Sequence, residues 1–400
     1  MNTEARAVPV IMYHSVGRMI PDWHWSFLTV PHVVFENQLA WLVKSGYQTA
    51  DLNELHEHVA GGRSLPERSV VLTFDDGYLD TWTYVAPLLS RYGLKGTVFV
   101  NPDFVDPRDL LRPTLEDVWA GRCREADLKV RGFMSWAELH RLSTQGPIAV
   151  HSHAVTHTWY PSGEKVIDFH YPGDGRYWLD WNNRPQDKPF YLRNPRGSAV
   201  PLGTPVYEHG KALMTRRYFP DPGEGEKLVA YVKQNGGADF FRQPEWRKEL
   251  FDQLAAFRAA RQTRGRLESR EEQIDRYRYE LSEAKSIIEE KLGITTDFLC
   301  WPGGGYDETA RTMALQIYRA VTLGSADPAP VKNRPGDPAA FIRRFGVPII
   351  EWRGRIYYPG GRYLVRFLDE YRGVQSARFR RRVLKALLLP AVYTKGEIVP

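Results

Sequence analysis

Two adjacent carboxylates follow an apolar run in the first quarter of the chain. Asp75 and Asp76 end the segment VVLTFDD (70–76), and Gly77 follows them. Neighbouring carboxylates raise each other's pKa unless a cation intervenes, so the pair favours a metal site in which one aspartate binds the ion and the other stays free as a base. The alternative is an Asp-Asp-Gly turn whose side chains cap backbone N–H groups. The pair alone leaves both interpretations open.

Three histidines lie close together in VHSHAVTH (150–157). His153 and His157 are four residues apart, so one helical turn would bring both imidazoles to the same side. Two histidines and one aspartate, with water completing the shell, are typical of a hydrolytic zinc-type centre. Solvated or capping histidines are the alternative, which fits one histidine better than three in seven residues.

Strands alternating with helices must position these groups. The apolar runs predict strands at 8–14, 69–74, 96–101, 148–153 and 296–301, and helices at about 32–46, 135–146 and 310–318. This order predicts an α/β fold with a parallel sheet, open or closed into a barrel. In such folds ligands bind beyond the carboxyl ends of the strands, which is where Asp75 and His153 fall.

Composition limits the classes of function. Of the 400 residues, 42% are hydrophobic, which supplies a real core, and a net charge of +6 is too small to indicate nucleic-acid binding. Cys123 and Cys300 are the only cysteines and show neither a disulfide framework nor a metal-ligand spacing. The segment MNTEARAVPVIMYH (1–14) lacks the apolar core of a signal peptide, and no apolar run approaches a membrane span. We therefore expect a cytoplasmic protein.

The alternation of strands and helices stops after His157 and resumes near residue 296. We expect four parts. Residues 1–157 form the first part of the barrel, and residues 158–243 form an insertion rich in aromatic residues and arginine. Residues 244–361 form a long helix that could break near Gly265, followed by the rest of the barrel, and residues 362–400 form a basic amphipathic C-terminal tail.

The sequence resembles the polysaccharide deacetylases of the NodB-homology class, carbohydrate esterase family four. The segments that carry the resemblance are TFDDG (73–77), HAVTH (153–157) and the joining APLLSRYGLKGTVFV (86–100). The resemblance implies a distorted (β/α) barrel with Asp75 as general base. It also implies one divalent ion held by Asp76, His153 and His157, with zinc expected first and cobalt, nickel, manganese or iron as alternatives.

Two further segments refine the resemblance. VPVIMYHSV (8–16) and SGYQTADLNEL (45–55) resemble the start of the poly-N-acetylglucosamine deacetylase branch, which implies that His14 is the acid that protonates the departing amine. An ordinary buried histidine is the alternative. FLCWPGGGYDE (298–308) corresponds to the family's proline-containing motif, so we expect the oxyanion site and the groove wall to include Tyr78, Trp301, Pro302 and Gly303.

The chain departs from the family pattern in three ways. Gly303 stands in the proline-containing motif where Tyr is common. Ala154 follows the first metal histidine, where Ser or Thr is usual, which removes one hydrogen bond near the metal. The Arg that often orients the base is absent from the proline-containing motif, where Cys300 and Trp301 stand. Another group must therefore orient Asp75.

The implied reaction is hydrolysis of N-acetyl groups on amino sugars of a polysaccharide or glycan precursor, which yields acetate and a free amine. The ion would lower the pKa of its water from ~15.7 toward ~7, and Asp75 would take the proton. Two alternatives stay open: a carbohydrate-binding protein without catalysis on the same fold, and a deacylase of a small non-glycan amide.

The insertion and the tail raise the questions of substrate and location. Aromatic rings stack on sugars and arginine binds anions, so the substrate candidates in the insertion are Trp159, Tyr160, Trp178, Arg176 and Arg184. They would suit an anionic glycan, a lipid-linked sugar or a nucleotide sugar. The alternative is that these residues form the small core of the insertion itself.

The tail RYLVRFLDEYRGVQSARFRRRVLKALLLPAV (362–392) has five basic residues and no acid between Arg378 and Lys385. This pattern favours peripheral contact with the inner membrane face, or packing on the barrel.

Overall fold

The computed structural model describes residues 7–193, 198–260, 265–324, 331–352 and 355–395. Residues 1–6 and 396–400, which belong to the predicted first and last parts of the chain, lie outside the described residues.

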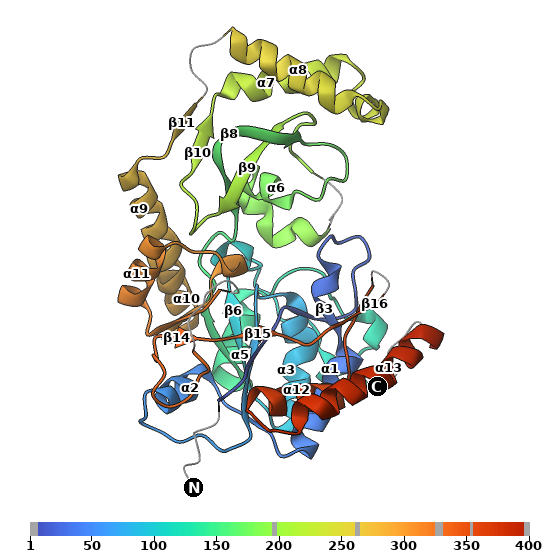
Figure 1. Cartoon of the computed structure of the whole chain (residues 1–400), viewed down its shortest axis with the longest axis vertical. Coiled ribbons are helices and arrows are strands. Elements are labelled where there is room, and N and C mark those ends of the chain that lie inside the picture. Colours follow the sequence, from blue (N-terminus) through green and yellow to red (C-terminus); the bar gives the residue numbers. More distant parts are fainter. Residues whose placement is uncertain (1–6, 194–197, 261–264, 325–330, 353–354, 396–400) are drawn as a thin grey trace.

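A curled parallel sheet of nine strands forms the lower body of the molecule (Figure 1). Eight strands follow the order β14-β13-β12-β7-β6-β5-β1-β15, and β4 pairs with β5. The strands are β1 (Val10–Tyr13), β4 (Gln48–Thr49), β5 (Ser69–Phe74), β6 (Gly96–Val100), β7 (Ile148–Ser152), β12 (Phe298–Leu299), β13 (Ala320–Thr322), β14 (Phe341–Ile342) and β15 (Phe345–Gly346). The edge strands β14 and β15 are separated by only two residues, Arg343 and Arg344, so the sheet must curl until its edges approach each other.

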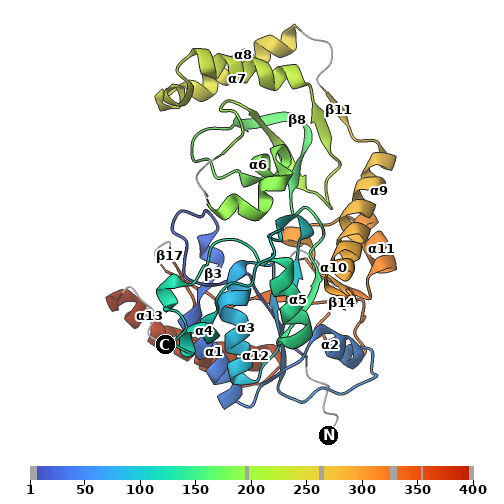
Figure 2. The same ribbon diagram turned by 180° about the vertical axis from the view of Figure 1, so that it is seen from behind.

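Helices cover the outside of this sheet (Figure 2). They are α1 (His32–Lys44), α2 (Leu52–Val59), α3 (Ala86–Tyr92), α4 (Leu115–Trp119), α5 (Trp136–Gln145), α10 (Ala284–Leu292), α11 (Glu308–Ile317) and α12 (Gly361–Tyr371). Capping boxes begin α2, through Asp51 and Glu54, and α5, through Ser135 and Glu138. The α/β class and the barrel expected from the sequence are confirmed.

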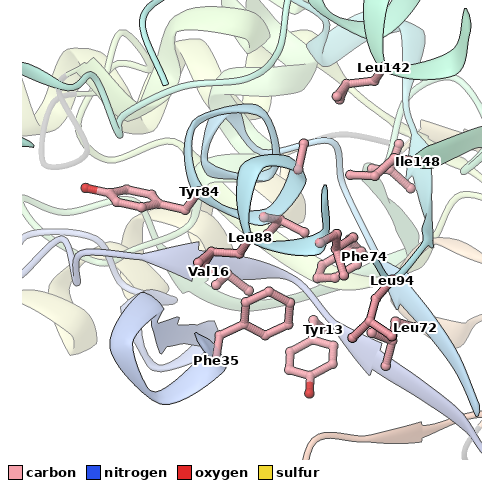
Figure 3. Close-up of a cluster of buried hydrophobic side chains, with 14 of the residues drawn as sticks. Tyr13, Val16, Phe35, Leu72, Phe74, Tyr84, Leu88, Leu94, Leu142 and Ile148 are labelled. Atoms are coloured by element: carbon pink, nitrogen blue, oxygen red, sulfur yellow. The ribbon is translucent and has the colours of Figure 1, made fainter. Parts of the chain in front are cut away.

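The barrel core explains why these residues form strands. Every residue of β5 is buried, as expected for a parallel strand covered on both faces. Figure 3 shows Leu72 and Phe74 of β5 beside Tyr13 of β1 and Phe35 of α1. The Tyr13 ring stacks on Phe74 at 5.4 Å, and its hydroxyl donates to Gln38 Oε1 at 2.9 Å, so the buried polar atom of Tyr13 is satisfied.

A second body, drawn in green and yellow, lies above the barrel in Figure 1. It contains β8 (Trp159–Phe169), α6 (Tyr177–Asn183), β9 (Pro205–Lys211), β10 (Tyr218–Pro220), α7 (Pro222–Gln234), α8 (Trp246–Ala259) and β11 (Gly265–Leu267). Its own apolar cluster includes Phe169 of β8, Leu228 of α7 and Leu250 of α8. The helical stretch expected to break near Gly265 does so: α8 is followed by β11, which begins at Gly265, and then by α9 (Arg270–Arg278), which a π-helical turn continues into α10. The four-part division stays a prediction, but packing and the β10–β11 pairing join α8 and β11 to the insertion.

Short strands and two helices complete the chain. β2 (Ser15–Gly17) pairs with β3 (Thr29–Pro31), and β16 (Ile350–Trp352) pairs with β17 (Arg355–Tyr357). The tail forms α12 and α13 (Ala377–Lys395), drawn in red in Figure 1. Of the residues that the structure describes, no helix combines the length and the apolar character needed to cross a membrane.

Candidate active site

A cavity of about 440 Å³ lies at the carboxyl edge of the parallel sheet. His14 follows β1, Asp75 and Asp76 follow β5, and His153 follows β7. All four line the cavity, together with His157. The parallel sheet therefore gathers residues that are up to 143 positions apart in the sequence, from His14 to His157, at one edge.

Asp76, His153 and His157 converge on one point. Asp76 Oδ1 lies 3.2 Å from His153 Nε2 and 3.3 Å from His157 Nε2, and the three ligand atoms all lie within 4.8 Å of one another. Asp76 Oδ1 is buried and, among the residues that the structure describes, has no hydrogen-bond partner. A buried carboxylate oxygen between two imidazole nitrogens fits a divalent cation, which would satisfy all three atoms.

The two rings differ in protonation. His153 Nδ1 lies 2.8 Å from the carbonyl oxygen of Cys300 and donates there, which turns Nε2 toward Asp76. Burial opposes the charged ring of His153, but Cys300 and the carboxylates of Asp76 and Asp75 outweigh burial and raise its pKa, so a cation would take the place of the proton on Nε2. Burial lowers the pKa of His157 to about 4, so this ring is neutral at pH 7. Burial alone would raise the pKa of Asp76, but its interactions with His157, His153 and His14 outweigh burial, so this pKa lies below the ordinary value.

The expected helical turn between the two histidines is wrong. Residues 153–158 form an irregular loop in which Ala154 and His157 have positive φ values of 57° and 44°. Positive φ is uncommon for alanine and, although histidine adopts it more often, costs energy for both residues, so surrounding contacts must hold it. Side-chain types alone therefore could not have predicted how the imidazoles meet.

Charged side chains from two distant segments hold this loop at Thr156. Glu280, in the π-helical turn before α10, is buried and accepts from the backbone N–H groups of Val155 and Thr156 at 3.1 and 3.0 Å, and from the Thr156 hydroxyl. Lys188 of the insertion donates to the Thr156 carbonyl at 2.9 Å and to Asp103 at 2.7 Å. The polar groups of Thr156 are thus bound from both sides, which fixes the backbone between the two histidines.

Arg344 supplies the missing partner of Asp75. Its Nη1 donates to Oδ1 of Asp75 at 2.6 Å and its Nη2 to Oδ2 at 2.9 Å, a bidentate pair inside the barrel. Arg344 is thus the group, unidentified from the sequence, that orients Asp75 in place of an arginine in the proline-containing motif. Arg344 lies between the edge strands β14 and β15, far in sequence from the proline-containing motif.

Cys300 completes this group without offering a better metal site. Its Sγ lies 2.8 Å from Arg344 Nη2 and 3.5 Å from Asp75 Oδ2. Asp75, His153 and Cys300 also have ligand atoms within 4.8 Å of one another. However, Arg344 already binds both oxygens of Asp75, and His153 Nδ1 binds a carbonyl, so the donors of Asp76, His153 and His157 are better suited to an ion.

The other residues expected at the oxyanion site lie close by. Tyr78, Trp301 and Gly303 line the cavity, whereas Pro302 is buried but does not line it. The Tyr78 ring stacks on Phe133 at 5.1 Å, and Trp301 stacks on Tyr306 at 4.5 Å. Gly303 has a φ of 55°, a conformation that a residue without Cβ adopts freely.

Of the five substrate candidates in the insertion, only Trp159 lines the cavity. Tyr160 packs under the Arg217 guanidinium at 4.4 Å, and Trp178 packs on His209 at 4.6 Å. Arg176 forms ion pairs with Asp168 at 2.9 Å and Asp174 at 3.1 Å. Arg184 lines a separate cavity that shares Trp181 and Tyr191 with the first.

Several residues of the cavity were not found from the sequence. In its aromatic wall, Trp181 and Tyr191 belong to the insertion that was expected to supply aromatic contacts, whereas the unpredicted members are Trp25, Phe27, Phe104, Phe133 and Phe345. Asn101 lines the cavity and donates to the carbonyl oxygens of His153 and of Ala154, the latter at 3.2 Å. Asn101 directly follows β6, so its place at a strand end was a signal available in the sequence.

Residues 62–171 match the family model described as polysaccharide deacetylase. A polysaccharide deacetylase-like protein of Bacillus subtilis (strain 168) is 36% identical over 93 residues, 23% of this chain and 31% of that protein. The poly-beta-1,6-N-acetyl-D-glucosamine N-deacetylase of Escherichia coli (strain K12) is 39% identical over 82 residues, 20% of this chain and 12% of that protein. The chain therefore matches less than a third of the length of either relative.

The fold also has a counterpart among solved structures. A de-N-acetylase from Aggregatibacter actinomycetemcomitans aligns with a TM-score of 0.50 at 15% identity, over 84% of this chain and 93% of that one. At this identity the likeness concerns the fold alone. This chain therefore has the fold of a NodB-type (β/α) barrel, and its residues 62–171, which include Asp75, Asp76, His153 and His157, match the polysaccharide deacetylase family model.

Proposed function

We propose that this chain is a metal-dependent hydrolase that removes N-acetyl groups from amino sugars of a polysaccharide or glycan precursor. One observation carries the proposal: the three convergent ligand atoms of Asp76, His153 and His157 lie in the same cavity as Asp75, whose carboxylate is bound by Arg344. A binding protein needs neither this ligand set nor a second, separately held carboxylate.

Asp76, His153 and His157 would hold one divalent ion, for which zinc suits the two imidazoles and one carboxylate best. Bound there, the ion would supply a water of lowered pKa and a Lewis acid for the acetyl carbonyl. Cobalt, nickel, manganese and iron accept the same donors and remain alternatives.

The remaining steps belong to the protein. Asp75 would take a proton from the attacking water, because Arg344 keeps its carboxylate ionised and oriented. His14 lines the cavity directly after β1. It would protonate the departing nitrogen, since the nitrogen of an amide leaves poorly as an anion. The backbone N–H of Gly303 or of Tyr78 would stabilise the developing oxyanion.

The substrate proposal rests on the cavity wall and on one relative. Aromatic rings are the surfaces on which sugar rings stack, and Trp159 and Trp181 form a stacked pair at 6.0 Å beside the metal ligand His157. The Escherichia coli relative is named for N-deacetylation of poly-N-acetylglucosamine. We therefore propose an N-acetylglucosamine unit as the reacting sugar, carried by a polymer, a lipid or a nucleotide.

Acetate release separates this proposal from its alternatives. The protein should release acetate and free amine in equal amounts from N-acetylglucosamine oligomers, and Asp75→Asn should lower the rate about 10²- to 10⁴-fold. A protein that binds the oligomers but releases no acetate would be a binding protein. Acetate from small N-acetylated amides but not from sugars would indicate the small-amide deacylase.

We also keep the cytoplasmic location as a proposal, and it rests on the cysteines. Cys123 and Cys300 are both free cysteines, and Cys300 is buried against the Asp75–Arg344 pair. Free cysteines without a disulfide are usual in a reducing compartment. Fractionation of the native host, followed with an antibody against the chain, tests the location: recovery in the periplasmic or secreted fraction would refute it.

A further inference from the structure

The last helix presents two different faces, and one of them is packed on the protein. In α13, side chains are described from Ala377 to Leu388. Arg381 donates to Glu370 at 2.6 Å and to the Tyr363 hydroxyl at 2.9 Å, and both partners belong to α12. Because Tyr363, Leu364 and Leu368 of α12 are themselves buried, this contact joins α13 to the barrel.

The opposite face of α13 carries exposed apolar side chains. Phe379, Val383 and Leu387 are 71%, 42% and 69% exposed. They are spaced by four residues and so form one stripe along the helix. The alternative raised by the sequence, that the apolar residues of the tail pack on the barrel, therefore holds for α12 but not for this stripe.

Basic residues border the stripe on both sides. On a helix, Arg380 lies about 100° to one side of Phe379 and Arg382 about 60° to the other. Arg380, Arg382 and Lys385 are exposed, and within the described part of the chain no carboxylate forms an ion pair with any of the three. The exposed face is therefore apolar along its centre and cationic along its borders.

We propose that this face of α13, defined by Phe379, Val383, Leu387, Arg380, Arg382 and Lys385, docks on an anionic lipid surface. A helix with this cross-section lies in the interface plane, with the apolar stripe among the acyl chains and the basic side chains at the headgroups. The excess of uncompensated positive charge favours an anionic membrane over a second copy of the same chain, because two such faces would repel each other.

The lipid-docking face is connected to the active-site cavity by one helix. Phe345 lines the cavity, and its ring lies 5.0 Å from Phe367 and 4.8 Å from Tyr371 of α12. α13 packs on the same helix, α12. Docking would therefore hold the cavity near the membrane surface. The docking proposal goes beyond the proposed function and does not depend on it.

Sedimentation with lipid vesicles tests the proposal on the full-length protein. We expect binding to vesicles of phosphatidylcholine mixed with phosphatidylglycerol, weak binding to phosphatidylcholine alone, and loss of binding as salt is added. The double variant Arg380→Gln/Arg382→Gln should lower the partition coefficient about 25-fold, since each basic residue contributes about fivefold. Phe379→Ser/Leu387→Ser should lower it as well, through the apolar stripe.

Matched variants on other surfaces serve as controls. Arg242→Gln/Arg278→Gln removes two exposed arginines elsewhere, and Met214→Ser/Phe251→Ser removes two exposed apolar side chains. Both should bind vesicles as the unchanged protein does. An unchanged melting temperature shows that each variant folds. If Phe379→Ser/Leu387→Ser fails to fold, Arg380→Gln/Arg382→Gln still tests the proposal.

Three results would overturn the proposal. The first is that the full-length protein ignores anionic vesicles at low salt. The second is that both α13 variants bind them as tightly as the controls. The third is that the protein is a dimer in solution that Phe379→Ser/Leu387→Ser dissociates, which would assign the face to a second copy of the chain.

Discussion

Arg344 donates one hydrogen bond to each carboxylate oxygen of Asp75, although the two residues are 269 positions apart. Burial alone would raise the pKa of Asp75, but the charge and hydrogen bonds of Arg344 outweigh it, and the pKa lies below its ordinary value. The curl of the sheet thus gives the proposed base its partner, because Arg344 stands between the two edge strands.

Arg344→Lys should change how the rate depends on pH. Lysine keeps the positive charge but cannot form the bidentate pair of hydrogen bonds, so the pKa of Asp75 should rise and its carboxylate should be held less firmly. Asp75 must be ionised to act as a base, so the acid limb of the kcat/KM profile should move to higher pH. We expect kcat to fall about 10- to 100-fold.

Arg343→Lys is the matched control, since Arg343 is the neighbouring residue and does not line the cavity. Its profile should keep the acid limb of the unchanged enzyme. An Arg344→Lys enzyme with an unshifted acid limb would contradict the role given to this arginine.

Glu280→Gln should weaken metal binding without removing a ligand. The amide oxygen of glutamine could still accept from the Val155 and Thr156 N–H groups, but without the negative charge these bonds weaken, and the amide N–H would face the Thr156 hydroxyl that now donates to Glu280. The loop between His153 and His157 would therefore be held less firmly. Changes of this kind typically cost 10- to 100-fold in metal affinity, measurable by competition with a chromogenic chelator.

Glu283→Gln, three residues on and exposed, is the control and should bind metal as the unchanged protein does. If Glu280→Gln and Glu283→Gln bind zinc equally tightly, Glu280 does not position the ligands.

Asp80→Asn should flatten the dependence of stability on pH. Asp80 is buried, accepts from the Ser15 hydroxyl, and has a pKa that burial raises to about 7. The pKa of this group is about 4 in the unfolded state and about 7 in the folded state, so between pH 4 and pH 7 the folded state binds the proton more tightly. As pH rises through this range, Asp80 therefore lowers the free energy of unfolding by up to ~1.4 kcal/mol per pH unit. Urea unfolding at pH 5 and pH 7 measures the difference.

The asparagine variant should lose less stability between these pH values than the unchanged protein, whereas exposed Asp252→Asn should not alter the difference. An Asp80→Asn protein with the full original pH dependence would show that Asp80 is ionised in the folded state at both pH values.

Strand ends were the part of the site that the sequence could reveal. Asp75, Asp76 and His153 follow apolar runs, and parallel strands bring such ends to one edge. Arg344 could not be found this way, because it lies in a two-residue link whose importance depends on how far the sheet curls. Likewise, the positive φ values of Ala154 and His157 come from the contacts of Glu280 and Lys188, not from the residues themselves.

The insertion shows a similar limit. Its composition indicated aromatic contacts, but not which rings face the cavity. Trp159 at the start of β8 faces it, whereas Tyr160, the next residue along the strand, is buried beneath Arg217. Successive side chains of a strand point to opposite sides, so the register had to be known before the candidates could be separated.

Trp159→Leu and Trp178→Leu should therefore behave differently. Trp159 lines the cavity, so its loss should raise KM for N-acetylglucosamine oligomers by about tenfold, the equivalent of one lost ring contact of ~1.4 kcal/mol. Trp178 is buried against His209, so its loss should lower the melting temperature and leave KM unchanged. The opposite pattern would remove Trp159 from the substrate site.

The metal dependence of acetate release tests the central claim most directly. Protein stripped with a chelator should release no acetate, and activity should return in proportion to added zinc until one ion is bound per chain. Asp76→Asn and His157→Ala should neither bind the ion tightly nor recover, while exposed His140→Ala should do both. If stripped protein releases acetate as fast as loaded protein, or if Asp76→Asn binds zinc with unchanged affinity, the proposed centre is wrong.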